Sequence, residues 1–106
     1  MDATERRVAL NEALYRDVNE NIREATRSGG HEDAHFVCEC GDPHCEERVA
    51  LPMDVYQSIR RDALHFFVKP GHEIPRVEAV VERHSDYFVV LKSEETRPLL
   101  EGRDGS

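Results

Sequence analysis

The chain has 106 residues, of which 39% are hydrophobic and 34% charged, and its 22 acidic and 14 basic side chains give a net charge of −8. This length accommodates one domain. The acidic balance argues against binding duplex DNA through a general basic face, because such binding depends on neutralising phosphates. The sequence has no run of about 18 apolar residues that could cross a membrane. Residues 1–5 also lack the pattern of a secretory signal, so we expect a cytoplasmic protein.

The first part of the chain is predicted to be one long helix. Residues 3–27 contain neither Gly nor Pro, and Asp2 is a typical N-cap. The helix should make about seven turns and end at Gly29-Gly30. It either lies on its own domain or pairs with a partner protein or a second copy. The residues that would make the second kind of contact are Val8, Leu14, Tyr15, Val18 and Ile22.

A denser region is predicted after a linker at residues 29–33. Its first elements are two short strands with a helix between them, and Pro52 suits the first position of that helix. The helix has an apolar side formed by Val55, Tyr56 and Ile59. The predicted ranges are 48–51 for the first strand, 52–61 for the helix and 64–68 for the second strand.

A β-hairpin is predicted near the C-terminus. Residues 77–83 and 87–92 flank a tight turn formed by residues 84–86. In the first strand, Val77, Ala79 and Val81 would share one apolar face. The second strand is apolar on both faces, so we expect it to be central in a sheet or covered by a helix.

The most informative stretch is Cys38-Glu39-Cys40-Gly41-Asp42-Pro43-His44-Cys45, which holds all three cysteines of the chain. An odd number of thiols in a chain without an export signal does not predict a disulfide framework. Zn²⁺ favours thiolate and imidazole ligands in a closed tetrahedron. Alternate positions of a strand point the same way, so Cys38 and Cys40 can chelate one ion. Gly41 suggests a zinc-knuckle turn, in which backbone N–H groups approach the sulfurs.

Three thiolates need a fourth ligand. The candidates are His31, His35, His44 and His72. His44 directly precedes Cys45, and adjacent side chains rarely converge on one ion. His72 follows the Pro70-Gly71 turn, which would present one imidazole from a distant loop. We therefore predict a structural zinc site formed by Cys38, Cys40, Cys45 and His72. The sequence alone does not distinguish zinc from iron at this site.

The residues do not predict an enzyme. Glu73 follows His72, and a carboxylate beside zinc is a feature of hydrolytic sites. However, the His-x-Glu and Pro-Cys-x-x-Cys signature of zinc deaminases is absent. No nucleophile elbow or phosphate-binding loop occurs in the sequence either. We therefore expect a non-catalytic protein.

The predicted fold is α+β: a small zinc-stapled antiparallel sheet with one short helix, preceded by the long N-terminal helix. We expect a helical arm at residues 1–30, a zinc-binding domain at residues 31–93 and a flexible acidic tail at residues 94–106. The tail carries four acids and two bases, which is typical of an unpacked end.

The sequence resembles a family of small uncharacterised bacterial proteins. The resemblance covers residues 10–93 and rests on the C-x-C-G-x3-C cluster, on Pro70-Gly71-His72 and on the Val-rich C-terminal hairpin. It implies a metal-binding domain in which His72 takes part, and it implies no activity.

Three functions remain open. The first is a protein-interaction or regulatory module that contacts a protein partner or a second copy through the N-terminal helix. The second is a nucleic-acid-associated zinc knuckle, with Arg60, Arg61, Arg76 and Arg83 as a basic patch, although interleaved acids favour solvated faces. The third is a redox-sensitive zinc-thiolate switch, which Glu39, Asp42, Glu46 and Glu47 oppose because nearby acids disfavour thiolates.

Overall fold

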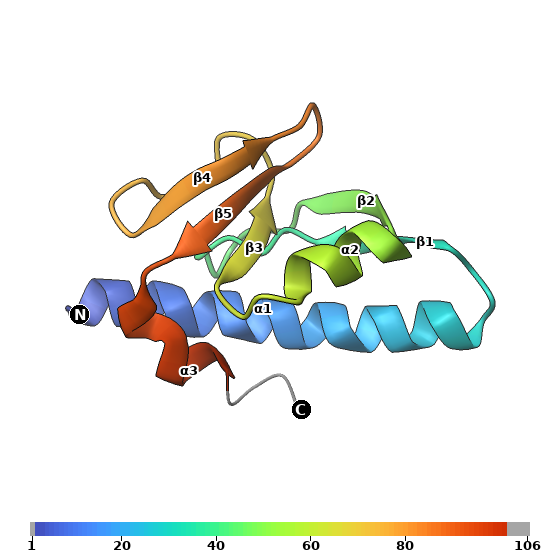
Figure 1. Ribbon diagram of the computed structural model, residues 1–106, viewed down its shortest axis with the longest axis horizontal. Helices are drawn as coiled ribbons and strands as arrows, with labels where there is room; N and C mark the ends of the chain where they lie inside the picture. The colour runs from blue at the N-terminus through green and yellow to red at the C-terminus, as the bar shows by residue number, and fades with distance from the viewer. Residues whose placement is uncertain (1, 102–106) are drawn as a thin grey trace.

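The computed structural model describes residues 2–101. A long helix runs along one side of the molecule, the strands and the second helix lie over it, and the last helix packs against it (Figure 1). In chain order the elements are α1 (Ala3–Ser28), β1 (Asp33–Val37), β2 (Arg48–Pro52), α2 (Met53–Arg60), β3 (His65–Val68), β4 (Glu78–Arg83), β5 (Phe88–Lys92), the 3-10 turn η1 (Glu94–Thr96) and α3 (Arg97–Glu101).

Helix α1 begins and ends where the sequence predicts. The Asp2 carboxylate accepts a hydrogen bond of 2.7 Å from the backbone N–H of Glu5, which satisfies one of the unpaired N–H groups of the first turn. At the other end, Gly30 adopts a φ of +77°, a conformation that glycine reaches without a Cβ clash. Among the described residues, no helix is both long enough and apolar enough to cross a membrane.

The strands form two small antiparallel sheets rather than one. Strands β1 and β2 pair from Asp33 opposite Pro52 to Val37 opposite Arg48. The other sheet has the order β3-β5-β4, so β5 is central, as its apolar faces predict. The α+β class, with a long N-terminal helix, antiparallel strands and short helices, is confirmed.

Two predicted boundaries shift at the first sheet. Asp33 begins β1 and does not belong to the linker. Pro52 ends β2 and lies just before α2, not at its first helical position. The reason is its backbone conformation, because φ −60° and ψ 147° are extended. The chain therefore passes from strand to helix without a loop.

The prediction that Val77, Ala79 and Val81 share one apolar face is wrong for β4. Ala79 and Val81 are exposed, whereas Glu78 is buried. A register irregularity between Val80 and Glu82 interrupts the regular alternation of the strand. Inside the molecule, Glu78 lies 3.6 Å from the ammonium of Lys92 on β5, and this ion pair compensates for burying a carboxylate.

Two groups of buried side chains form the core. We call the first the aromatic cluster; Phe36 stacks on Tyr56 with ring centroids 4.2 Å apart, and both contact Phe67 edge-on. The second, the cysteine cluster, contains the thiols of Cys38 and Cys40. Its other buried members are Ala13, Leu64, Phe66, Val68, Val90 and Leu100.

Helix α1 lies on the rest of the chain through a face that is half apolar and half polar. Its buried residues are Val8, Ala9, Glu12, Ala13, Arg16 and Asn19. Val8, predicted to be an outward contact, is therefore buried. Leu14 and Val18 are exposed (53% and 38%), and Leu10 (39%), which the sequence pattern places off the seam, is exposed with them.

The C-terminal segment is more ordered than predicted. Residues 94–101 form η1 and α3 instead of a frayed tail. Leu100 is buried at 3% exposure in the cysteine cluster, and α3 contacts α1. Burial of one large apolar side chain outweighs the polar composition of this stretch. Residues 102–106 of the predicted tail lie outside the described residues.

Candidate metal centre

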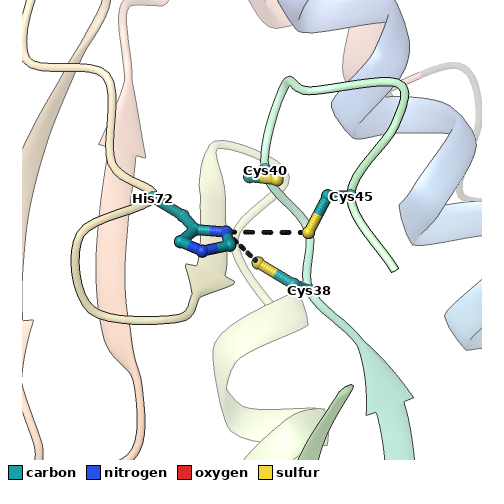
Figure 2. Close-up of side chains that lie close together, drawn as sticks. All are labelled: Cys38, Cys40, Cys45 and His72. Atoms are coloured by element: carbon teal, nitrogen blue, oxygen red, sulfur yellow. Dashed lines mark hydrogen bonds between the residues drawn. The ribbon is translucent and has the colours of Figure 1, made fainter. Parts of the chain in front are cut away.

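The structure brings together the four side chains that the sequence predicts as metal ligands. Cys38 and Cys40 follow β1, Cys45 lies in the turn before β2, and His72 comes from the loop between β3 and β4. Their ligand atoms all lie within 4.8 Å of one another. Figure 2 shows the imidazole of His72 pointing at the thiols from the opposite loop.

The spacing of the donor atoms suits a single small ion. His72 Nδ1 lies 3.7 Å from Cys38 Sγ and 3.6 Å from Cys45 Sγ (Figure 2). A tetrahedral zinc with Zn–S of about 2.3 Å and Zn–N of about 2.0–2.1 Å separates such ligand atoms by about 3.6 Å. His72 Nδ1 therefore stands at nearly the distance from Cys38 and Cys45 that coordination of one ion requires.

The other three candidate histidines lie elsewhere. His31, His35 and His44 are exposed, and none of them belongs to the cluster of potential ligands. His35 lies on β1 at a position that alternates with the buried Phe36. The backbone N–H of His44 donates to Asp42 Oδ1 at 2.9 Å, which shapes the turn that carries Cys45.

Gly41 has a packing role in addition to the predicted place in a knuckle turn. A Cβ at this position would lie 2.5 Å from Val8 Cγ1 and 3.3 Å from Ile74 Cδ1. The first separation is shorter than real side chains tolerate, so any other residue would push α1 away from the cysteine turn. Gly41 therefore permits close packing of the helix against the turn.

Backbone N–H groups support the sulfurs. The amide of Lys69 donates to Cys38 Sγ at 3.3 Å. Backbone hydrogen bonds from Asp42 and Glu47 favour the thiolates of Cys40 and Cys45, respectively. Partners of this kind orient metal ligands and stabilise their charged form.

Without a cation, the surroundings favour the thiolate form of only one of the three cysteines, Cys40. The hydrogen bond from Cys38 lowers the pKa of Cys40 to about 5. The same hydrogen bond, together with burial, raises the pKa of Cys38. Burial also raises the pKa of Cys45. Three thiolates this close repel one another, and a divalent cation provides the charge that allows all three to ionise.

The side chain between the first two cysteines faces the opposite way. Glu39 is fully buried, and its carboxylate accepts hydrogen bonds from Arg16 Nε at 2.8 Å and Nη2 at 3.0 Å. Asn19 Nδ2 adds a bond of 2.9 Å, and the amide of Phe67 adds one of 3.3 Å. Glu39 therefore does not repel the thiolates freely, because Arg16 neutralises it.

Further contacts join α1 to the cysteine segment on both sides of Glu39. Asn19 donates to the carbonyl of Val37 at 2.9 Å and accepts from its N–H at 2.8 Å. Asn11 donates to the carbonyl of Gly41 at 3.1 Å, and the Tyr15 hydroxyl donates to that of Asp42 at 2.9 Å. The residue-by-residue reading of the sequence missed this set, which we call the α1 clamp (Asn11, Tyr15, Arg16 and Asn19). Polar residues recurring every three or four positions on a helix were the available signal.

A cleft of about 310 Å³ opens beside the four ligands. Cys45 and His72 are half-buried rather than enclosed. The site therefore has a path to solvent. The residues that line the cleft are Cys40, Asp42, Gly71, His72, Glu73 and Ile74.

The predicted basic patch is divided among separate contacts. Arg60 Nε lies 2.6 Å from a Glu20 carboxylate oxygen, and Arg76 Nη2 lies 2.8 Å from one of Asp2. Arg83 lies over the ring of Phe88. These interactions favour solvated, locally paired charges over a surface that tracks phosphates.

Comparisons with protein-family models, curated proteins and solved structures found no match to the chain. The resemblance to a bacterial family consequently stays a prediction. The chemistry of the site must be inferred from its own residues.

Proposed function

We propose that this chain is a non-catalytic zinc protein whose Cys₃His site has a structural role. The observation that carries the proposal is the convergence of Cys38, Cys40, Cys45 and His72 from two loops. Four protein donors complete a tetrahedron and leave no position for a reactive water. A structural role follows from that closed ligand set.

The donor set favours zinc over the alternatives. Thiolate and imidazole ligands in tetrahedral arrangement are typical of Zn²⁺. Iron–sulfur clusters usually take four cysteines, and this chain has three. Hard cations such as Mg²⁺ and Ca²⁺ prefer oxygen ligands.

A bound ion would add a second link between parts of the chain that the aromatic cluster already joins. The ligands come from the β1–β2 turn and from the β3–β4 loop, so one ion ties the two sheets together. A small core rarely provides more than about 3–5 kcal/mol. Structural zinc in small peptides provides about 10–16 kcal/mol at neutral pH, so zinc would dominate the stability of this region.

Elemental mass spectrometry of protein purified without added metal tests the proposal. We expect one zinc per chain in the wild type and a clear loss in His72→Ala. His44→Ala is the matched control, because His44 is exposed and lies outside the cluster. Absence of metal from the wild type, or equal zinc content in the wild type and His72→Ala, would contradict the proposed site.

As a regulatory role, we propose that the outer face of α1 binds a protein partner. Its contact residues would be Leu10, Leu14 and Val18, which form an exposed apolar stripe on the side of α1 away from its buried residues. Helix-in-groove recognition uses apolar anchors at this spacing. Val8 is excluded from this surface by its burial and Tyr15 by its bond to Asp42. Ile22, also predicted to be an outward contact, packs against the aromatic cluster instead.

The two possible occupants of the stripe are separable by experiment. Sedimentation of the zinc-loaded protein over a concentration series measures self-association, and a purified candidate partner is titrated separately. Leu14→Glu should abolish whichever contact exists. Arg27→Glu, on an exposed position farther along α1, serves as a control. Unchanged association in Leu14→Glu would exclude this face.

A further inference from the structure

Glu39 joins the cysteine segment to α1, because it lies between two of the proposed metal ligands and its side chain bonds to the helix. Cys38 and Cys40 point to the metal side, and Glu39 between them points to α1. This alternation is the ordinary geometry of extended backbone. Any rotation of this segment that misplaces the thiols also pulls Glu39 out of its pocket.

Glu39 has little freedom in that pocket. Both side chains of the Arg16–Glu39 pair are nearly inaccessible, at 3% and 0% exposure. Two parallel bonds fix the planes of the guanidinium and the carboxylate. Arg16 is itself oriented by the carbonyl of His65, to which it donates, and by the ring of Phe66 below it. A buried charge that loses its partner is strongly destabilising, so the pair has one favourable arrangement.

Polar bonds account for much of the attachment of α1. Its buried apolar side chains are Val8, Ala9 and Ala13, which are small and offer limited area. The α1 clamp instead contacts residues 37, 39, 41 and 42, on either side of both first cysteines. The middle of the helix is therefore tied to the backbone conformation that the metal site also requires, while Glu12 and Glu20 pair with residues outside the cysteine segment.

We propose that zinc binding and docking of α1 are coupled through Glu39, with Arg16 as a positioning residue for the metal centre. This inference rests on the proposed zinc site. Docked α1 holds the cysteines in the chelating conformation, and bound zinc holds Glu39 where Arg16 can reach it. Coupling of this kind is reciprocal, because each event must favour the other by the same factor.

The cleft beside the ligands would allow zinc to leave and rebind in the folded protein, so that the coupling can be measured. Since His72 is half-buried and lines an open cleft together with Cys40, a bound ion would be accessible to competing chelators. Loss of zinc would then loosen α1 at the α1 clamp. The apolar side chains that α1 covers, including Phe66 under Arg16, would become exposed.

Zinc affinity of suitable variants tests the coupling. Arg16→Lys keeps the charge but loses the two-bond geometry. We expect zinc, measured by competition with a chelator, to bind this variant about 10- to 100-fold more weakly, as for other residues that orient metal ligands. The Co²⁺-loaded variant should keep the absorption bands of the wild type, because the four ligands are unchanged.

Arg27→Lys is the matched control. Arg27 lies on the same helix and makes a similar pair of bonds to Glu24, but it is exposed. Its zinc affinity should equal that of the wild type. If Arg16→Lys does not fold, Tyr15→Phe replaces it, because it removes one exposed bond to Asp42. Tyr15→Phe should weaken zinc binding in the same direction by a smaller factor.

Hydrogen exchange provides the reciprocal measurement. Removal of zinc from the wild type should increase exchange most at residues 11–19, which carry the α1 clamp. This increase should be smaller in the Arg16 variant. Zinc affinities of the folded Arg16 and Tyr15 variants within about twofold of the wild type would overturn the coupling and leave the site intact. Failure of the wild type to bind zinc or cobalt would instead overturn the proposed function, and the coupling with it.

Discussion

Around Phe36, Tyr56 and Phe67 the core consists of stacked and edge-on rings, whereas around Cys38 and Cys40 it contains thiols beside a buried ion pair. The aromatic cluster gains its free energy from area removed from water. The cysteine cluster also places groups together that repel one another unless a cation is added. The two parts of this small core therefore differ in what stabilises them. Apolar burial suffices for the aromatic cluster, whereas the cysteine cluster also needs a cation.

The largest effect is expected from removal of the proposed zinc. A strong chelator should unfold the region around the cysteine cluster, because zinc binding of about 10–16 kcal/mol exceeds the contribution of a small apolar core. Thermal unfolding by circular dichroism, with and without chelator, measures the effect. A midpoint that stays within a few degrees would show that packing alone suffices.

The aromatic cluster is tested by Phe36→Ala in zinc-saturated protein. Phe36 is fully buried and contacts both Tyr56 and Phe67, so the free energy of unfolding should fall by about 3–5 kcal/mol. Urea titration measures the change. A loss below about 1 kcal/mol would mean that zinc, and not ring packing, determines the stability of both clusters.

A smaller effect on the free energy of unfolding is expected from a buried charged group outside the metal site, formed by Glu12, Glu78 and Lys92. Glu12 and Glu78 approach the same ammonium of Lys92, at 3.0 and 3.6 Å, and all three side chains have 0% exposure. Burial raises the pKa of Glu12 well above its ordinary value, and the Glu78 carboxylate raises it further. One ammonium faces two carboxylates, so a proton on Glu12 makes the group neutral.

The sign of the pH dependence follows from that raised pKa. Folded Glu12 holds its proton more tightly than unfolded Glu12, so its contribution is complete below the unfolded pKa and is lost as pH rises through the folded pKa. Glu12→Gln removes this dependence. The unfolding free energy of the wild type should therefore fall relative to the variant as the pH rises above the ordinary pKa range of a Glu, about 4–5.

Urea unfolding of both proteins over a series of pH values above that range checks this expectation. Glu24→Gln is the control, since Glu24 is exposed and pairs with Arg27 on the surface; its curve should parallel the wild type. A constant difference between wild type and Glu12→Gln at all pH values would show that Glu12 is ionised throughout.

Much of the local structure is predictable from the sequence because its signals are local. Asp2 caps α1, Gly30 takes the left-handed conformation, and the apolar run of residues 87–91 is the central strand. The metal cluster is predictable for the same reason. Three cysteines within eight residues can reach one ion, and the Pro70-Gly71 turn marks a loop that can present His72.

The missed features depend on contacts between distant segments. Glu78 is an ordinary polar strand residue in the sequence, and it is buried because Lys92 and Glu12 lie beside it. Leu100 lies in a polar stretch, and it is buried because α3 reaches the cysteine cluster. Residue type alone predicts exposure for Glu78 and an unpacked tail around Leu100.

By itself, the sequence determined the helix, the hairpin and the set of potential metal ligands, since each depends on residues close together along the chain or on the chemistry of Cys and His. Only the tertiary structure decided which face of α1 is buried and what Glu39 does. Arg16 lies 23 residues from Glu39 in the chain, and no periodicity shows that they pair. Burial of a charge is favourable only when its partner is in place, and that partner is supplied by the fold.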